Sequence, residues 1–307
     1  MYILKRIMVA LDLTDMDDTL IRYAAFISTQ STIEKVIFIH TEKSLEIPAE
    51  LMEGMEREVV PTESSIRTLI QEKVMTYFRE LPGLEVEVQV MEGGPVKEML
   101  KLSKREQVNL LLVGRKLHLR GSGVLPQKLL RTGKVSVLFV PENNEPKLSK
   151  AVVATDFSEY SLMALDRMLH SAINRPSMAI ECLHVYEVPS GYITLGESYK
   201  SFDIRMQGFA NEKFEQVLQK FPELQDRASL RLVKQEYNDD LGEVIVLEAK
   251  RSKADLLVIG AKGKSTAALF IVGSVTEKIL RYDDNIPLLV FRDENEEVGF
   301  LDALLDA

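Results

Sequence analysis

The sequence is poor in the residues that build disulfides and metal centres. It contains one cysteine, no tryptophan and four histidines among 307 residues. A lone Cys182 cannot form a disulfide within the chain or supply the thiolate set of a zinc site, so a reducing compartment is expected. Because Cys182 lies in the run AIECLHVY, we interpret it as a small core residue. The histidines form no metal-binding pattern, and we interpret His40 and His184 as structural.

Long apolar runs and an excess of basic residues are also lacking. No apolar run approaches the roughly 18–20 residues of a membrane helix, and the one after Arg6 ends at Asp12, too early for a signal-peptide core. The formal net charge of −9 disfavours non-specific binding to nucleic acid or to an anionic membrane, since both need a basic face. We therefore expect a cytoplasmic protein with neither of these partners. Its length and its 46% of hydrophobic residues suit two domains of ordinary size.

The sequence repeats itself. Five pairs of short segments match in the same order, at a separation that grows from 144 to 151 residues, as small insertions in loops would cause. The pairs are 6–12 with 150–156, 36–41 with 180–185, 108–114 with 254–260, 127–131 with 277–281, and 137–140 with 288–291. The pattern predicts domains at 1–144 and 148–292, separated by a polar stretch with two prolines and followed by an acidic tail at 293–307.

Both halves predict the same architecture. Apolar runs rich in β-branched residues alternate with helix-length segments, which is typical of buried parallel strands joined by crossover helices. The longest helices are predicted near 62–80 and 204–220, where apolar residues recur at helical spacing. Each half is thus expected to be an α/β, Rossmann-like domain of about five parallel strands. Such sheets bind ligands beyond the carboxyl ends of the strands, at the topological switch point.

A glycine-rich stretch, GAKGKSTAALFIVGS, begins at Gly260 and ends at Ser274. Gly260 permits a sharp turn and a close approach of a ligand, while Ser274 can begin a helix with Glu277 at capping-box spacing. A helix start presents free N–H groups to phosphate, and Lys262 and Lys264 add positive charge nearby. The spacing fits neither a P-loop nor a dinucleotide fingerprint. Alone, the stretch therefore indicates either a phosphate cradle or a simple turn.

Asp156 directly follows the first apolar run of the second half. Its carboxylate could accept hydrogen bonds from a nucleoside. It could also cap the helix that contains Leu162, Leu165 and Met168. The two roles are compatible.

The combination G-x2-G-x9-G-S followed by VTEKIL resembles the ATP-binding form of the universal stress protein family. VVATDFSEYSLMAL and CLHVYE also resemble that family, and the resemblance covers nearly the whole chain as two copies, of which the second is closer. It implies two sheets of strand order 3-2-1-4-5 and bound ATP, AMP or ADP, with or without Mg²⁺. The nucleotide-binding residues that it implies are Asp156, Val185, Gly260, Gly263, Gly273, Ser274, Val275 and Thr276.

The first half departs from this pattern. Leu117 stands where the second glycine is expected, and Gly123-Val124-Leu125-Pro126 replaces Gly-Ser-Val-Thr. Because the valine side chain cannot hydrogen-bond and proline has no N–H, we predict a degenerate nucleotide site. The residues after Gly114 are basic and predict either a solvated loop or a site for an anion or a partner. They are Arg115, Lys116, His118 and Arg120.

Three functions stay open at this point. The first is a nucleotide-binding regulatory protein of the stress response, whose occupancy changes its shape or its partners. The second is a slow Mg²⁺-dependent ATPase, although no paired carboxylates or Ser–His–Asp order identify a catalytic residue. The third is a scaffold without a ligand, against which the intact glycines of the second half argue.

The ends of the two halves suggest how the chain assembles. The strands predicted at 135–140 and 287–291 are expected to pair as an internal pseudo-dimer, because pairing covers edges that invite aggregation. A homodimer of two chains is left open. The acidic tail at 293–307 predicts a frayed or surface-docked helix or a partner-binding segment, because apolar residues recur in it at helical spacing: Phe300, Leu301, Leu304 and Leu305.

Overall fold

The structure is a computed structural model in which the chain forms two compact units, Tyr2–Pro146 and Lys147–Arg292. It describes residues 4–29, 32–46, 62–81, 83–115, 128–131, 135–171, 173–236, 239–261, 274–282 and 285–292. Within these ranges, no helix is both long and apolar enough to cross a membrane.

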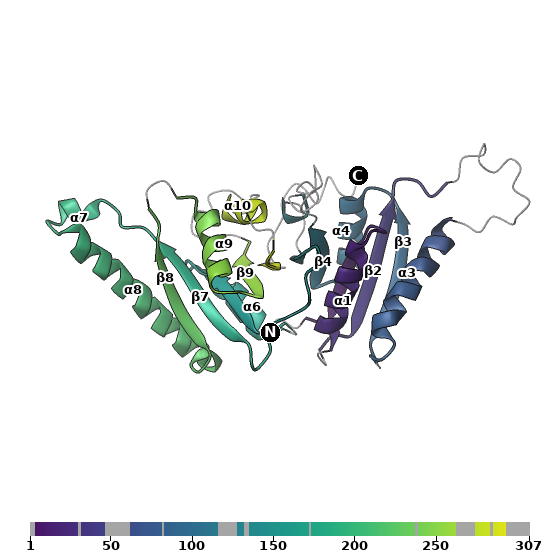
Figure 1. The fold of residues 1–307 in the computed structure, drawn as a ribbon, viewed down its shortest axis with the longest axis horizontal. Helices are drawn as coiled ribbons and strands as arrows, with labels where there is room; N and C mark the ends of the chain where they lie inside the picture. The colour runs from purple at the N-terminus through teal and green to yellow at the C-terminus, as the bar shows by residue number, and fades with distance from the viewer. Residues whose placement is uncertain are drawn as a thin grey trace, which may run out of the picture. The chain divides into compact units, whose positions relative to one another are not determined.

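The first unit is a parallel sheet with helices packed on its faces (Figure 1). Its described elements are β1 (Arg6–Leu11), α1 (Met16–Ser28), β2 (Lys35–Glu42), α3 (Thr62–Phe78), β3 (Glu85–Glu92), α4 (Pro95–Arg105), β4 (Leu110–Arg115) and β5 (Ser136–Pro141). The strand order is β3-β2-β1-β4-β5, and every neighbouring pair is parallel.

The second unit repeats this plan. Its described elements are β6 (Lys150–Ala154), α6 (Glu159–Leu169), β7 (Ala179–Tyr186), α7 (Gly191–Thr194), α8 (Tyr199–Lys220), a 3₁₀ turn at Pro222–Leu224, β8 (Ala228–Lys234), α9 (Leu241–Arg251), β9 (Leu256–Gly260), α10 (Ser274–Tyr282) and β10 (Leu288–Phe291). The order β8-β7-β6-β9-β10 is again all parallel. The predicted order 3-2-1-4-5 is therefore confirmed in both halves. Helix α8 begins earlier than predicted because Ser198 caps it, accepting a hydrogen bond from the Ser201 N–H at 3.1 Å.

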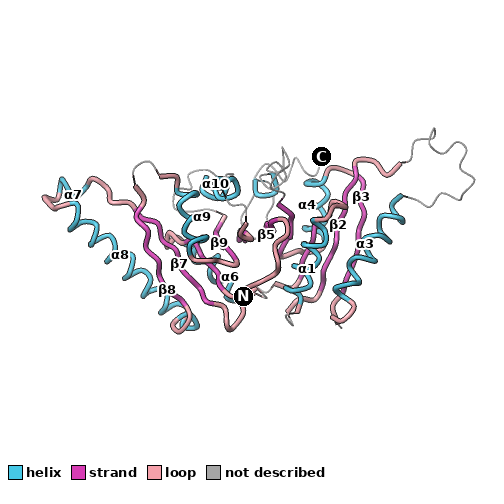
Figure 2. The backbone as a smooth tube through the Cα atoms, in the orientation of Figure 1, coloured by secondary structure: helices cyan, strands magenta, loops and turns pink. Residues whose placement is uncertain are grey.

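The strand order explains why helices cover both faces of each sheet (Figure 2). The chain moves outward from β1 through β2 to β3 and then crosses back to β4. Right-handed crossovers made in opposite directions place their helices on opposite faces, so α4 lies opposite α1 and α3. Burial on both faces requires continuous apolar strands, and Ile7, Met8 and Val9 of β1 are all fully buried. The reversal leaves a switch point between β1 and β4, and another between β6 and β9.

The duplication extends to the backbone geometry. The residue two positions past the end of β1, Leu13, has φ 60°, and its counterpart Phe157 has φ 59°. After α4 and α9, Gln107 and Lys253 have φ 52° and 54°. All four are non-glycine residues in the left-handed region, where a side chain is unfavourable. The turns therefore repeat although the side chains differ.

A side-chain clasp at the amino end of each sheet repeats too. Asn109 Oδ1 accepts hydrogen bonds from the backbone N–H groups of Lys5 and Arg6, both at 3.0 Å. In the second unit, Asp255 Oδ2 accepts those of Ser149 and Lys150 at 2.9 and 3.0 Å. In each unit, a side chain just before the fourth strand thus accepts hydrogen bonds from backbone N–H groups at the start of the first strand.

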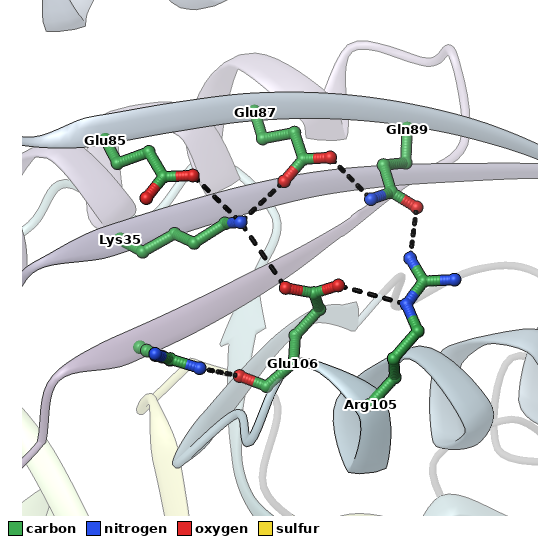
Figure 3. A network of polar contacts seen from close by, with 7 residues as sticks. Lys35, Glu85, Glu87, Gln89, Arg105 and Glu106 are labelled. Atoms are coloured by element: carbon green, nitrogen blue, oxygen red, sulfur yellow. Dashed lines mark hydrogen bonds and ion pairs between the residues drawn. The ribbon is translucent and has the colours of Figure 1, made fainter.

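A ring of charged and amide side chains covers the α4 face of β3 in the first unit (Figure 3). Lys35 Nζ lies 2.9, 2.7 and 3.4 Å from carboxylate oxygens of Glu85, Glu87 and Glu106. The ring closes through Gln89 and Arg105, which join Glu87 to Glu106 by hydrogen bonds of 2.6, 3.2 and 3.0 Å. Hydrogen bonds from Lys35 lower the pKa of Glu87, and those from Arg105 and Lys35 lower the pKa of Glu106. Glu87 on β3, the outermost strand of the first unit, thus stays ionised at neutral pH.

Candidate functional site

The predicted site residues that the structure describes gather at the carboxyl ends of three adjacent strands of the second unit. Val185 is the penultimate residue of β7, Asp156 follows the end of β6, and Gly260 ends β9. Val153 pairs with Val258 in the parallel register of β6 and β9, which places the loop at Asp156 beside Gly260. These residues therefore surround the switch point, where ligands bind in sheets of this kind.

The loop that carries Asp156 is held in one conformation by its own side chains. Asp156 Oδ1 accepts hydrogen bonds from the N–H and the hydroxyl of Ser158, at 3.0 and 2.5 Å. Ser158 caps helix α6 in turn, accepting from the Ser161 N–H at 3.4 Å. The alternative that Asp156 itself caps this helix is wrong, because the chain needs the two further residues to turn into α6. Asp156 instead fixes the cap.

The base of the loop is braced from β7. His184 Nδ1 donates to the Thr155 carbonyl oxygen at 2.8 Å, and the His184 ring lies 4.7 Å from the Phe157 ring between centroids. The Thr155 hydroxyl accepts from the Phe157 N–H at 3.0 Å, which supports the left-handed backbone there. In the first unit, His40 Nδ1 donates to the Leu11 carbonyl at 3.0 Å. The predicted structural role of the two histidines is confirmed.

Helix α10 begins at Ser274, where a helix start was predicted. Val275 is half-buried and Thr276 is buried, both in the first turn. Gly263, Gly273 and the Ser274 side chain lie outside the described part of the structure, so their predicted roles stay predictions. Among the described residues, no group of three or more histidine, cysteine, aspartate or glutamate side chains is placed to hold a metal ion.

In the first unit, a side chain packs against the end of β4 beside the switch point. A Cβ added at Gly114 would lie 2.5 Å from Cγ of Met16, a residue that is only 4% exposed. Asp12 keeps the place of Asp156, and its Oδ1 accepts from the Thr14 hydroxyl at 2.6 Å. The thioether chain of Met16 thus packs directly against the end of β4.

A buried carboxylate holds the same loop. Asp17 is fully buried, and its two oxygens accept the N–H groups of Asp12 at 2.9 Å and Leu13 at 3.1 Å. Burial raises the pKa of Asp17, against the effect of these hydrogen bonds. Sequence analysis missed both Met16 and Asp17. The available signal was that the second copy has Tyr160 in place of Met16 and Ser161 in place of Asp17.

Only part of the predicted basic loop can be compared with the structure. Arg115 is the last residue of β4 and is 6% exposed, so its assignment to a solvated loop is wrong. The strand continues one residue past Gly114 because Arg115 pairs with Pro141 of β5. Lys116, His118 and Arg120, with the substituted glycine positions 117 and 123–126, lie outside the described ranges.

Comparison with known proteins identifies the fold and the family. The universal stress protein family model matches residues 4–141 and again 147–292. A putative universal stress protein from Pseudomonas aeruginosa UCBPP-PA14 aligns over 99% of this chain and 98% of its own, with 13% identity and a TM-score of 0.67. A functionally unknown protein from P. aeruginosa PAO1 aligns over 99% and 97%, with 13% identity and a TM-score of 0.66.

A third structure, a universal stress protein from Archaeoglobus fulgidus DSM 4304, aligns over 95% of this chain and 97% of its own, with 16% identity and a TM-score of 0.60. At these identities the structural likeness shows the fold alone. No curated protein matches the chain. The family model, in contrast, accounts for nearly every residue of both units, and the chain therefore belongs to the universal stress protein family, as two tandem copies.

Proposed function

We propose that the second unit binds an adenine nucleotide, namely ATP, AMP or ADP, and that the chain acts as a regulatory protein of the stress response. The observation that carries the proposal is the convergence of Asp156, Val185 and Gly260 at the carboxyl ends of β6, β7 and β9. All three are among the nucleotide-binding residues that the family resemblance implies. They meet at the switch point, where a doubly wound sheet has room for a ligand.

The residues present fit such a ligand. The Asp156 carboxylate suits the hydroxyl and amino donors of a nucleoside, and half-buried Val185 offers an apolar surface. Gly260 lets the ligand lie against the end of β9. The N–H groups at the start of α10 suit phosphate, together with Gly263, Gly273, Ser274 and Thr276 as the family resemblance implies. Mg²⁺, when bound, would neutralise phosphate charge.

The proposal assigns one nucleotide to each chain. In the first unit, Met16 packs on Gly114, where the ligand would approach the end of β4. The Val124 and Pro126 substitutions remove hydrogen-bonding groups that the second copy offers as Ser274 and Thr276. Occupancy of the second unit would then be the signal, and its change would alter shape or partners.

The experiment begins with protein purified without added nucleotide. Denaturing it and identifying the released ligand by mass spectrometry should yield about one adenine nucleotide per chain, from the one-site argument above. Two per chain would contradict the asymmetry. If none is released, titration of the protein with MgATP and with AMP by calorimetry decides whether the site binds at all.

Matched variants locate the site. Asp156→Asn keeps an oxygen for the two Ser158 hydrogen bonds but removes the charge, and it should weaken binding by about tenfold, as loss of a charge-assisted hydrogen bond does. Asp12→Asn makes the same change in the first unit and should leave the dissociation constant unchanged. Equal effects of the two substitutions would refute the assignment to the second unit.

We further propose domain limits at 1–144 and 148–292, an internal pseudo-dimer of the two units and a cytoplasmic location. The tail at 293–307 is proposed as a surface or partner-binding helix.

A further inference from the structure

Helix α10 approaches α9 more closely than side chains normally allow. A Cβ added at Gly242 would lie 2.5 Å from Cβ of Lys278, 3.2 Å from its carbonyl carbon and 3.1 Å from the backbone N of Ile279. Two of these atoms belong to the backbone of α10, so the clash cannot be relieved by a side-chain rotation. Glycine in the first turn of α9 is therefore what permits this contact.

An ion pair joins the helices at the same point. Lys278 Nζ lies 2.7 Å from Asp240 Oδ2, and the two side chains are 41% and 23% exposed. Asp240 is also the N-cap of α9, where its Oδ1 accepts the Gly242 N–H at 2.9 Å. The two oxygens of one carboxylate thus serve the start of α9 and the middle of α10. The hydrogen bond from Lys278 lowers the pKa of Asp240, which favours the ionised carboxylate.

Helix α9 is in turn fixed to the sheet by a buried carboxylate. Glu248, 4% exposed, accepts a hydrogen bond from Arg231 of β8 at 2.8 Å and from Arg251 at 2.5 Å. Burial alone would raise the pKa of Glu248, but the two arginines outweigh it and the pKa is lowered. Beside it, Ser252 at the end of α9 donates to Glu181 of β7. Contacts with β7 and β8 therefore hold α9 in place, and α9 in turn holds α10.

The contact lies close to the nucleotide-binding turn. Lys278 and Ile279 follow Thr276 by two and three residues, and they lie in the second turn of a helix that begins at Ser274. A helix moves as a rigid element, so a displacement at Lys278 displaces the N–H groups of the first turn by a similar amount.

We propose that the contact of Gly242 and Asp240 with Lys278 positions α10 for the nucleotide and thereby sets the nucleotide affinity of the second unit. This inference rests on the proposed function. It implies reciprocal coupling: bound nucleotide stabilises the α9–α10 contact, and any partner that moves α9 changes nucleotide affinity.

The sequence of the first unit does not repeat the residues of the α9–α10 contact. At the repeat spacing of 146 residues, Val96 replaces Gly242 and Gly94 replaces Asp240. Gly94 has no carboxylate, and Val96 carries the side chain that the close approach forbids. The positioning contact and the intact glycine motif occur in the same copy.

Calorimetric titration of the full chain with MgATP tests the inference. In Gly242→Ala, the Cβ–Cβ distance of 2.5 Å must grow by more than about 1 Å to reach normal contact, and displacements of that size cost up to about 100-fold at a positioned site. We expect the dissociation constant to rise at least about tenfold. Gly208→Ala is the matched control, because Gly208 lies in α8 with open space around its Cβ. It should leave the constant unchanged.

Two further variants separate positioning from general destabilisation. Lys278→Met removes the half-exposed ion pair and should weaken binding about two- to fivefold, an effect that fades in high salt, whereas Lys200→Met at an exposed place in α8 should not. Gly114→Ala strains the first unit and should lower thermal stability without changing nucleotide affinity.

The outcomes distinguish this inference from the proposed function. Failure of the wild-type chain to bind MgATP or AMP would overturn both. Binding by the wild type and by Gly242→Ala with equal dissociation constants would overturn the positioning role alone. A rise in the constant for Gly114→Ala as large as that for Gly242→Ala would also overturn it, since stability and not position would then govern affinity.

Discussion

The packing of Met16 on Gly114 gives a prediction that can be worked through quantitatively. The substitution Gly114→Ala places a Cβ 2.5 Å from Met16 Cγ, an atom near the root of the side chain, which cannot simply swing away. Overpacking of this kind costs about 1–3 kcal/mol in unfolding free energy. For a unit of roughly 150 residues this lowers the melting temperature by about 2–4 °C per kcal/mol.

The second half of the experiment removes the Met16 side chain. Met16→Ala deletes a side chain that is 4% exposed and should cost about 2–5 kcal/mol through the cavity that it leaves. In the double variant the added methyl group has no Cγ to meet and fills part of that cavity. The double variant should therefore be more stable than the sum of the single effects predicts, by about 1–3 kcal/mol.

The unfolding free energies of the wild type, the two single variants and the double variant are measured by urea unfolding, monitored by circular dichroism. Gly208→Ala is the control for replacing a glycine in open space. Additive effects, within about 0.5 kcal/mol, would refute the contact. They would also remove the evidence that Met16 packs against the end of β4 in the first unit.

Three further predictions concern the ring on β3, the cysteine and the loop before α6. Lys35→Met removes the ammonium group that Glu85, Glu87 and Glu106 share and should lower the unfolding free energy by about 1–2 kcal/mol at pH 7, after allowance for screening. Because the pKa of Glu87 is lowered in the folded state, the stability difference between the wild type and Lys35→Met should be fully present above pH 4.5, the ordinary pKa of Glu87, and should shrink as the pH falls below it. A stability difference that is unchanged at pH 3 would contradict this. Burial raises the pKa of Cys182 to about 12, so a thiol reagent at pH 8 should modify only the unfolded chain, and rapid native labelling would disprove its burial. Ser158→Ala loses the cap of α6 and the bond to Asp156 and should lower the melting temperature through a cost of about 1–2 kcal/mol, whereas Ser158→Thr should retain most of the stability; equal losses would exclude the cap.

The sequence allowed much of the fold to be predicted because the relevant signals are local or repeated. Apolar runs such as the one around Val9 define strands, and the matched spacing of the two copies supports one architecture for both. Asp156 and Gly260 could be selected because their positions at strand ends follow from the same pattern. Family resemblance supplied the strand order, which periodicity alone does not contain.

Other features could not be predicted because they depend on distances between parts of the chain far apart in sequence. Gly242 in a helical segment indicates only a locally weak helix, and its reason appears when α10 lies against it. Arg231 and Glu248 give no pairing signal, since any of many charges could meet across a sheet and a helix. Asp17 looks like an ordinary acidic residue of a first helical turn, where the dipole favours it, rather than a buried acceptor.

The paired left-handed turns make each molecule its own replicate experiment. Leu13 and Phe157 share one backbone conformation, within a degree in φ, but stand in different surroundings. Glycine substituted at either position relieves the strain of a positive φ, but Phe157→Gly also removes the ring that contacts His184, so the difference between the two responses reports the lost side chain and its surroundings.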